Sequence, residues 1–222
     1  MILVGLSGGI GSGKSTVARL LEDRGAVIVD ADRITHEILA PGGAAVSAVV
    51  ERFGTGVLRP DGGIDRPNLR SIVFADAGAR RDLEAITHPL IYAGIAARLA
   101  APHALDSVVV IDAPLLVETA GRDRVGLQAL VVVAADEAQQ IERAVARSGI
   151  TPAEAAAVIA AQAPAERKLA AADYVLDNRG SPEDLEAAVA TLWEELMARF
   201  GAGSEEGGPG GSSSPAGRSG AG

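Results

Sequence analysis

The 222-residue sequence contains no cysteine. This absence excludes disulfide bonds, thiolate zinc sites and cysteine nucleophiles from any account of its stability or chemistry. Aromatic residues are also scarce, at 3%, whereas 48% of the residues are hydrophobic. The core must therefore be built from aliphatic side chains, and the chain is long enough for one α/β domain with insertions.

The sequence also has fewer basic than acidic residues, and its formal net charge is -9. Such a balance argues against a general nucleic-acid or anionic-membrane surface, which would need a basic face. An anionic ligand must then be held by local cations instead of by the overall field. Lysine is especially rare, since Lys14 and Lys168 are the only two in the sequence.

Long hydrophobic runs are missing as well, and no apolar stretch reaches the length that spans a membrane. The first residues form an apolar strand pattern without a basic region, so we expect no signal peptide. A soluble, cytoplasmic protein is the default expectation; the oligomeric state stays open, with a monomer favoured. Residues 201–222 are rich in Gly, Ser and Pro, and we expect this tail to be disordered.

The most informative stretch lies at residues 1–21. An apolar run over residues 2–6 predicts a buried strand, a glycine-rich turn follows at 8–13, and Lys14 begins a helical pattern. This is G-x-x-x-x-G-K-[ST] between a strand and a helix, which indicates a phosphate loop for a nucleoside triphosphate. The alternative is a glycine-rich turn that merely contains a lysine.

The physical chemistry of phosphate binding explains these residue types. Glycines let successive backbone N–H groups point inward, and the helix N-terminus adds partial positive charge. Lys14 would reach the β- and γ-phosphates of ATP, and the Ser15 hydroxyl would ligate Mg²⁺. The predicted nucleotide-binding residues of this loop are Gly9, Ile10, Gly11, Ser12, Gly13, Lys14, Ser15 and Thr16.

The rest of the chain alternates short apolar runs with helical periodicity. Further strands are predicted at 26–30, 107–112, 128–134 and 174–176, and a proline after His88 predicts the start of a new helix. The alternation predicts an α/β fold with a five-stranded parallel sheet covered on both faces. Residues 1–200 would form this domain, with a helical substrate-side insertion at about 33–105 and a lid at about 138–171.

A phosphate loop alone does not specify the reaction. Guanine-specific GTPases usually add an Asn-Lys-x-Asp base-reading motif, and neither lysine lies in such a setting. A dinucleotide-binding fold is the second alternative, because acidic residues end the second strand, where such proteins bind a ribose. The sequence lacks G-x-G-x-x-G, however, and that fold leaves Lys14 without a role.

Asp30 and Asp32 fit phosphoryl transfer better. They follow a strand beside the phosphate loop, at the sheet edge where open α/β sheets bind ligands. One carboxylate there could orient an acceptor hydroxyl and take its proton, while the other acts through Mg²⁺. The alternative is that either residue only caps the next helix.

Several short blocks then follow in a fixed order: GGIGSGKST at 8–16, DADR at 30–33, ITHPLI at 86–91, DAPLLVE at 112–118, and AAQ at 160–162 with ADYVLDN at 172–178. Together they resemble the dephospho-coenzyme A kinase family, over about residues 1–200. The resemblance implies a P-loop NTPase three-layer fold. It also implies transfer of the ATP γ-phosphoryl group, with Mg²⁺, to the ribose 3′-hydroxyl of dephospho-CoA.

The resemblance also implies roles for single residues. Asp32 matches the proposed base, Lys14 and Ser15 match the ATP and Mg²⁺ site, and Arg143 and Arg147 match lid arginines that close on the phosphates. Residues matching the acceptor side are His88, Pro114, Leu115, Leu116 and Glu118, and Asn178 is a candidate for binding adenine. Some have a plainer alternative. The arginines could be solvated, His88 could be a helix-terminal cap, the two leucines could be core residues, and Asn178 could be a turn asparagine.

Two other functions remain open at this point. Another small-molecule P-loop kinase, for instance one acting on nucleoside monophosphates, would share the loop but not the Asp-Ala-Asp and His-Pro blocks. A nucleotide-dependent switch could dispense with Asp32, whereas a kinase would need it.

Overall fold

The computed structural model describes residues 1–102, 107–113 and 125–200, and its centre is one sheet of five parallel strands. The strand order is β2-β3-β1-β4-β5, so β1 lies in the middle. The strands are β1 (Ile2–Gly8), β2 (Val27–Asp30), β3 (Val108–Asp112), β4 (Ala129–Ala134) and β5 (Tyr174–Asp177). The five predicted strands are thereby confirmed.

The three central strands β1, β3 and β4 are buried almost throughout. Their near-continuous apolar sequences suit a position with helices on both faces. Parallel neighbours also require helical crossovers, which explains why helices separate the strands along the chain. The carboxyl ends of the strands consequently meet at one edge of the sheet.

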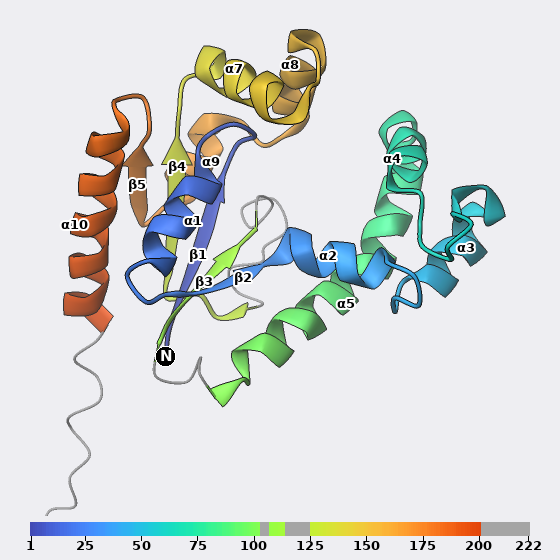
Figure 1. Ribbon diagram of the computed structural model, residues 1–222, viewed down its shortest axis with the longest axis horizontal. Helices are drawn as coiled ribbons and strands as arrows, with labels where there is room; N and C mark the ends of the chain where they lie inside the picture. Colours follow the sequence, from blue (N-terminus) through green and yellow to red (C-terminus); the bar gives the residue numbers. More distant parts are fainter. Residues whose placement is uncertain (103–106, 114–124, 201–222) are drawn as a thin grey trace, which may run out of the picture.

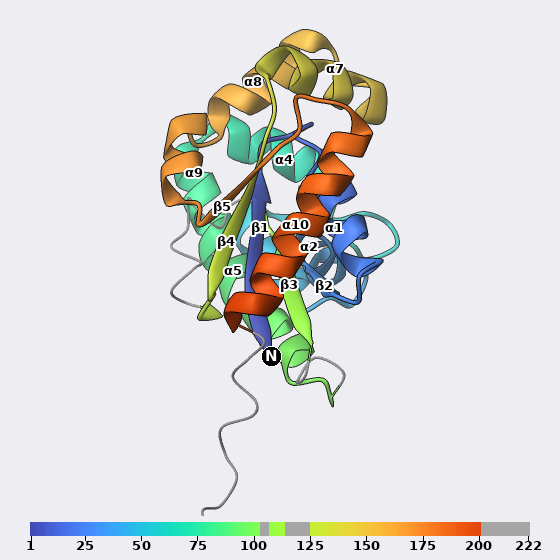
Figure 2. The ribbon, with the colours of Figure 1, turned by 90° about the vertical axis from the view of Figure 1, so that its left-hand side faces the viewer.

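Two helical layers cover the sheet. One face packs against α1 (Lys14–Glu22) and α10 (Pro182–Phe200), which contribute Val17, Leu21 and Val189 to a core with residues of β1. The other face packs against α2 (Ala31–Leu39), α5 (Ala77–Leu99) and α9 (Ala165–Ala171). Figure 1 shows α10 on one side of the sheet and α5 on the other, and Figure 2 shows α10 in front of it.

A helical unit after β2 projects from the sheet on the side of α2. It comprises α3 (Val46–Phe53), a 3₁₀ turn (Thr55–Val57), α4 (Arg66–Ala75) and the first part of α5 (Figure 1). The unit has a small core of its own, formed by Leu39, Ala45, Val49, Val57, Ile64 and Leu69. A tight turn lies at 61–63, where Arg59 N–H donates to Gly63 O at 2.8 Å and Leu58 bridges Ile64.

A second helical unit lies beyond the carboxyl ends of β1 and β4. It is the hairpin of α7 (Glu137–Ser148) and α8 (Pro152–Ala161), seen above the sheet in both ribbon views (Figures 1 and 2). A reciprocal capping box between Thr151 and Glu154 begins α8. Both helical units therefore flank the edge of the sheet at which the phosphate loop lies.

The expected helix break at Pro89 is wrong, because α5 continues from Ala77 to Leu99 with Pro89 inside it. Proline removes one backbone hydrogen bond and crowds the preceding turn. Here the helix packs on both sides of that point, with Ile86 and Leu90 in the small core and Ile95 against the sheet. Tertiary packing thus outweighs the local preference.

The predicted disordered tail at 201–222 lies outside the described residues. Among the helices that the structure describes, none combines the length and the hydropathy needed to cross a membrane.

The α10 face provides a test of the fold. Leu196 is fully buried in the main core, whereas its neighbour Met197 is 42% exposed. We expect Leu196→Ala to lower the free energy of unfolding by about 2–5 kcal/mol, because it leaves a cavity. Met197→Ala should change it by only about 0.5 kcal/mol. Urea unfolding followed by circular dichroism measures both, and equal effects would contradict the packing described for α10.

Candidate functional site

The phosphate loop joins β1 to α1 at the edge of the sheet. Gly11 and Gly13 have φ angles of 69° and 96°, in a region of backbone conformation that residues with a side chain rarely adopt. Space is also limiting, since a Cβ on Gly11 would collide with the backbone of Gln140 and one on Gly13 with the Asn178 side chain. The glycines of the motif are thus required both by conformation and by close packing.

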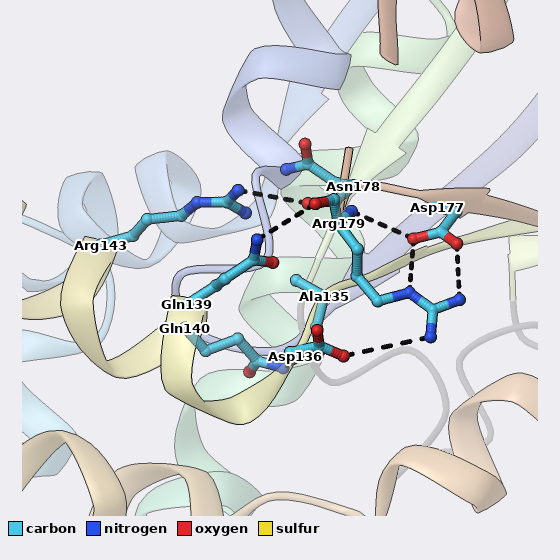
Figure 3. Close-up of polar contacts among 8 residues, drawn as sticks. All are labelled: Ala135, Asp136, Gln139, Gln140, Arg143, Asp177, Asn178 and Arg179. Atoms are coloured by element: carbon cyan, nitrogen blue, oxygen red, sulfur yellow. Dashed lines mark hydrogen bonds and ion pairs between the residues drawn. The ribbon is translucent and has the colours of Figure 1, made fainter. Parts of the chain in front are cut away.

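Asn178 holds this loop from the end of β5. Its Nδ2 donates to Ser12 O at 2.7 Å, and its backbone N–H donates to Ala134 O at 2.8 Å. Arg143 on α7 in turn donates from Nη2 to Asn178 O at 3.2 Å (Figure 3). Asn178 therefore ties the loop to β4, and through Arg143 to α7.

The junction around Asn178 leaves polar groups unpaired. Of the described buried side-chain atoms, Ser12 Oγ, Gln139 Oε1 and Arg143 Nη1 have no hydrogen-bond partner. Gln139 and Arg143 both point at the backbone that follows β5, with Gln139 Nε2 donating to Arg179 O at 3.2 Å (Figure 3). Unsatisfied buried groups are costly, so these three atoms are polar capacity beside the phosphate loop that the described protein groups do not use.

On the other side of the loop, Lys14 Nζ forms an ion pair with the carboxylate of Asp112. Asp112 ends β3, directly opposite Asp30 in the register of β2 and β3. Burial raises the pKa of the Asp112 carboxyl above its usual range, and the charges of Asp30 and Asp32 act in the same direction, while Lys14 opposes them. Three carboxylates thus converge where the strands end.

Asp30 and Asp32 differ in their local roles. Asp30 caps α2, because its Oδ1 accepts the Arg33 N–H at 3.0 Å, so the capping alternative is realised for this residue. Asp32 lies exposed in the first turn of α2 and lines a cleft. Of the two, Asp32 therefore has the carboxylate that does not serve as the helix cap.

That cleft has a volume of about 780 Å³ and is lined by residues of the phosphate loop and of both helical units. One wall is the phosphate loop from Gly8 to Ser15, with Asp30, Asp32 and Asp112 beside it. The opposite wall comes from α4 and α5 through Arg70, Phe74, Arg80 and Glu84. The α7–α8 hairpin contributes Arg147, Val158 and Ala161, and Gln162 follows it.

The structure brings many of the predicted site residues together at this cleft. Those lining it are Gly9, Ile10, Gly11, Ser12, Gly13, Lys14, Ser15, Asp32 and Arg147. Arg143 and Asn178 lie behind the loop, and Thr16 is an exposed residue of α1. His88 packs edge-on against Tyr92, at 6.3 Å between ring centroids, and is not among the described residues lining the cleft.

Four predicted acceptor-side residues, Pro114, Leu115, Leu116 and Glu118, lie outside the described part of the chain. Sequence reasoning in turn missed Asp112, Arg70, Arg80 and Gln162 as lining residues. Asp112 had a usable signal, because an acidic residue that ends a buried apolar strand lies at the ligand-binding edge. Arg70 and Arg80 had no such signal, since an arginine on a predicted helix is usually part of a solvated face.

The donor set suits a divalent cation bound together with phosphates. Among the described residues, no group of three or more acidic or histidine side chains has the arrangement of a complete metal site. Mg²⁺ does not require one, since it commonly uses one or two carboxylates and takes its other ligands from phosphates and water. The Ser15 hydroxyl and the nearby Asp112 carboxylate are oxygen groups that could serve as the protein ligands of such an ion.

Comparison with known proteins supplies independent evidence. A family model described as dephospho-CoA kinase matches residues 2–184. The dephospho-CoA kinase of Streptomyces avermitilis is 49% identical over 199 residues, covering 90% of this chain and 96% of that protein. The enzyme of the same name from Geobacter sulfurreducens is 46% identical over 194 residues, covering 87% and 98%.

Solved structures agree on the fold. The crystal structure of TT1252 from Thermus thermophilus has a TM-score of 0.67 and 34% identity, covering 88% of this chain and 97% of that one. Dephospho-CoA kinase from Campylobacter jejuni has a TM-score of 0.59 at 24% identity, covering 87% and 96%. The three-layer α/β arrangement predicted from the sequence is thereby confirmed.

The raised pKa of Asp112 gives a pH-dependent prediction. The folded protein holds this proton to higher pH than the unfolded chain, so the stabilisation is complete below the unfolded pKa and is lost as pH rises through the folded one. The wild-type free energy of unfolding minus that of Asp112→Asn should therefore fall as pH rises from about 4 towards neutrality. Denaturant titrations in EDTA without nucleotide measure this difference.

Asp61 is the matched control, because hydrogen bonds from Arg59 hold the pKa of its carboxyl below the usual range. Stabilisation by Asp61 is present above the unfolded pKa and lost as pH falls through the folded one. The corresponding difference for Asp61→Asn should therefore rise with pH. A rising difference for Asp112→Asn as well would show that burial does not dominate at Asp112.

Proposed function

Since the chain belongs to the dephospho-CoA kinase family, we propose that it transfers the γ-phosphoryl group of ATP to the ribose 3′-hydroxyl of dephospho-CoA. The products are CoA and ADP, and the reaction is the last step of CoA synthesis. One observation supports this most strongly: the phosphate loop and the Asp32 carboxylate line the same cleft.

The donor side is the phosphate loop. Its backbone N–H groups and the N-terminus of α1 would hold the β- and γ-phosphates, with Lys14 as the mobile cation. Behind the loop, beside Asn178, Gln139 and Arg143 each have one unpaired polar atom. This is where we propose that the adenine base binds, because its ring nitrogens and amino group can satisfy such donors and acceptors.

The acceptor hydroxyl would lie between Asp32 and the γ-phosphate. The Asp32 carboxylate takes the proton of the 3′-hydroxyl as that oxygen bonds to the γ-phosphorus. The bond from phosphorus to the β–γ bridging oxygen breaks on the opposite side, and ADP leaves with the bonding electrons. Asp32 thus orients the nucleophile and accepts one proton per turnover.

Ser15 and Asp112 are the residues that we propose to hold Mg²⁺. When bound with ATP, this ion would neutralise charge on the β- and γ-phosphate oxygens. The ion pair of the Asp112 carboxylate with Lys14, beside the loop, supports this proposal.

The far wall of the cleft suits an anionic acceptor. Arg70 and Arg80 project from α4 and α5 into the cleft, and dephospho-CoA carries a diphosphate that such cations can bind. These local charges are what a chain with a net charge of -9 needs to hold an anion. Acceptor binding by His88, Pro114, Leu115, Leu116 and Glu118 stays a prediction from the resemblance.

The α7–α8 hairpin is the proposed lid. Arg147 lines the cleft from α7, so closure of the hairpin would bring its guanidinium onto the transferring phosphate and exclude water. Arg143, one turn earlier, contacts Asn178 instead. We therefore propose that Arg147 acts on the phosphoryl group, and that Arg143 acts on the nucleotide together with Asn178.

The function is tested by ADP release from purified protein with Mg²⁺-ATP. Dephospho-CoA should stimulate turnover, whereas AMP, CMP and gluconate should not. Turnover with one of the other acceptors but not with dephospho-CoA would keep a P-loop kinase and overturn the proposed substrate. ATP binding without acceptor-dependent turnover under any of these conditions would indicate a switch.

Replacement of the proposed base tests the mechanism. Asp32→Asn should lower kcat by about 100- to 10,000-fold while leaving ATP affinity nearly unchanged, because only proton acceptance is lost. The matched control is Asp23→Asn, since Asp23 is exposed at the end of α1, away from the cleft. A variant of Asp32 that keeps full kcat would rule out this carboxylate as the base.

Replacement of Arg147 and replacement of Arg143 should change different kinetic constants. Arg147→Met should lower kcat by about 100-fold, because it removes one cation from the transferring phosphate. Arg143→Met should chiefly raise the KM for ATP, by about tenfold, through the loss of support at Asn178. Steady-state kinetics at saturating dephospho-CoA distinguishes the two; a loss confined to kcat for Arg143→Met would place that arginine on the phosphoryl group.

A further inference from the structure

Lys168 is the second of the two lysines in the sequence, and it is only 5% exposed. It projects from α9 into a cavity of about 330 Å³ that adjoins the phosphate loop at Gly9. Apolar residues of β4 and α9, including Val132, Val133 and Leu169, also line this cavity. A buried ammonium group in such surroundings requires oxygen partners.

Gln162 supplies one such oxygen. Its Oε1 accepts a hydrogen bond from Lys168 Nζ at 3.3 Å and a second from the backbone N–H of Ile10 at 3.3 Å. Ile10 belongs to the phosphate loop, and Gln162 lines both the small cavity and the main cleft. One amide oxygen therefore lies where a loop N–H, a lysine ammonium and the cleft meet.

The two donors occupy both lone pairs of the Gln162 amide oxygen. A loop N–H and an ammonium group aimed at one oxygen form the kind of arrangement that binds a phosphate oxygen, because hydrogen bonds to an anion are stronger than those to an amide. The other lysine shows the same pattern, since Lys14 Nζ is paired with the carboxylate oxygen of Asp112 on the opposite side of the loop. Both lysines thus end on protein oxygens beside the phosphate loop.

We propose that Gln162 Oε1 occupies the position of an oxygen of the terminal phosphate of a bound nucleoside triphosphate, and that Lys168 binds that phosphate. When the triphosphate binds, its oxygen replaces the amide oxygen on Ile10 N–H and on Lys168 Nζ. Lys168 is then a second cationic phosphate ligand that the loop motif does not contain. This inference rests on the proposed function only in requiring ATP as the donor.

The chemistry of lysine fits this role. Its ammonium is a compact charge on a flexible stem, so it can follow one oxygen from the amide to a phosphate without a fixed planar geometry. Because Gln162 follows directly after α8 and Lys168 lies six residues further on, the pair also connects the α7–α8 hairpin to the loop. Binding of the terminal phosphate would thereby change the contact between the loop and the hairpin that flanks the cleft.

The inference predicts discrimination between triphosphate and diphosphate. ADP lacks the phosphate that Lys168 would bind, so Lys168→Met should weaken binding of a non-hydrolysable ATP analogue by about 10- to 100-fold and leave ADP binding within about twofold. Titration calorimetry with Mg²⁺ measures both constants. Arg167→Met is the matched control, because Arg167 is the exposed neighbour on the same helix, and it should change neither constant.

A second variant keeps the test decisive if Lys168→Met does not fold. Gln162→Glu nearly preserves shape but places a carboxylate on the same two donors, so it should compete with the terminal phosphate and weaken the ATP analogue at least about tenfold more than ADP. Equal losses for both nucleotides, or no loss, would overturn the inference. Failure of the wild-type protein to bind ATP at all would instead overturn the proposed function.

Discussion

The proposed nucleotide site depends on one constraint, which is that a backbone loop must be able to present its N–H groups to an anion. Gly11 and Gly13 meet it through positive φ angles, and close contacts with Gln140 and Asn178 leave no room for a side chain at either position. Because β1 lies in the middle of the sheet, the loop is anchored in the most buried part of the molecule. Such rigid donors are already oriented before the ligand arrives, which is how binding sites stabilise developing charge most effectively.

The topology then determines what surrounds the loop. Parallel strands end at one edge, so Asp30 from β2 and Asp112 from β3 converge beside Lys14. The helical unit after β2 and the α7–α8 hairpin after β4 both follow strands at this same edge, and together with the loop they line the cleft. Burial at this end of the sheet raises the pKa of the Asp112 carboxyl, and the nearby charges of Asp30 and Asp32 act in the same direction. The cation of Lys14 opposes both effects by favouring the carboxylate form. A chain with a net charge of -9 thus assembles a site for anionic substrates from a few local cations.

Much of this organisation could be predicted from the sequence, because the strongest signals are local. The strands follow from continuous apolar runs, and the loop follows from glycines and Lys14 between a strand and a helix. The helix over Pro89 could not be predicted, because packing against two separate cores outweighs the local penalty. Arg70 and Arg80 were equally hidden, since only the folding of α4 and α5 against each other turns an ordinary helix face into a cleft wall. The contacts of Gln162 with Ile10 and Lys168 could not be predicted either, because they form only in the folded chain and Ile10 is 152 residues away in the sequence.

If the phosphate loop holds the γ-phosphate beside the hydroxyl that Asp32 deprotonates, the phosphoryl group is transferred to one ribose oxygen. The most direct measurement is the position of the new phosphate, determined by ³¹P and ¹H NMR of the product made from Mg²⁺-ATP and dephospho-CoA. We expect a single new phosphomonoester, coupled to the proton at ribose C3′. A phosphate on the 2′-oxygen or on another group, or an unchanged acceptor after prolonged incubation, would contradict this expectation.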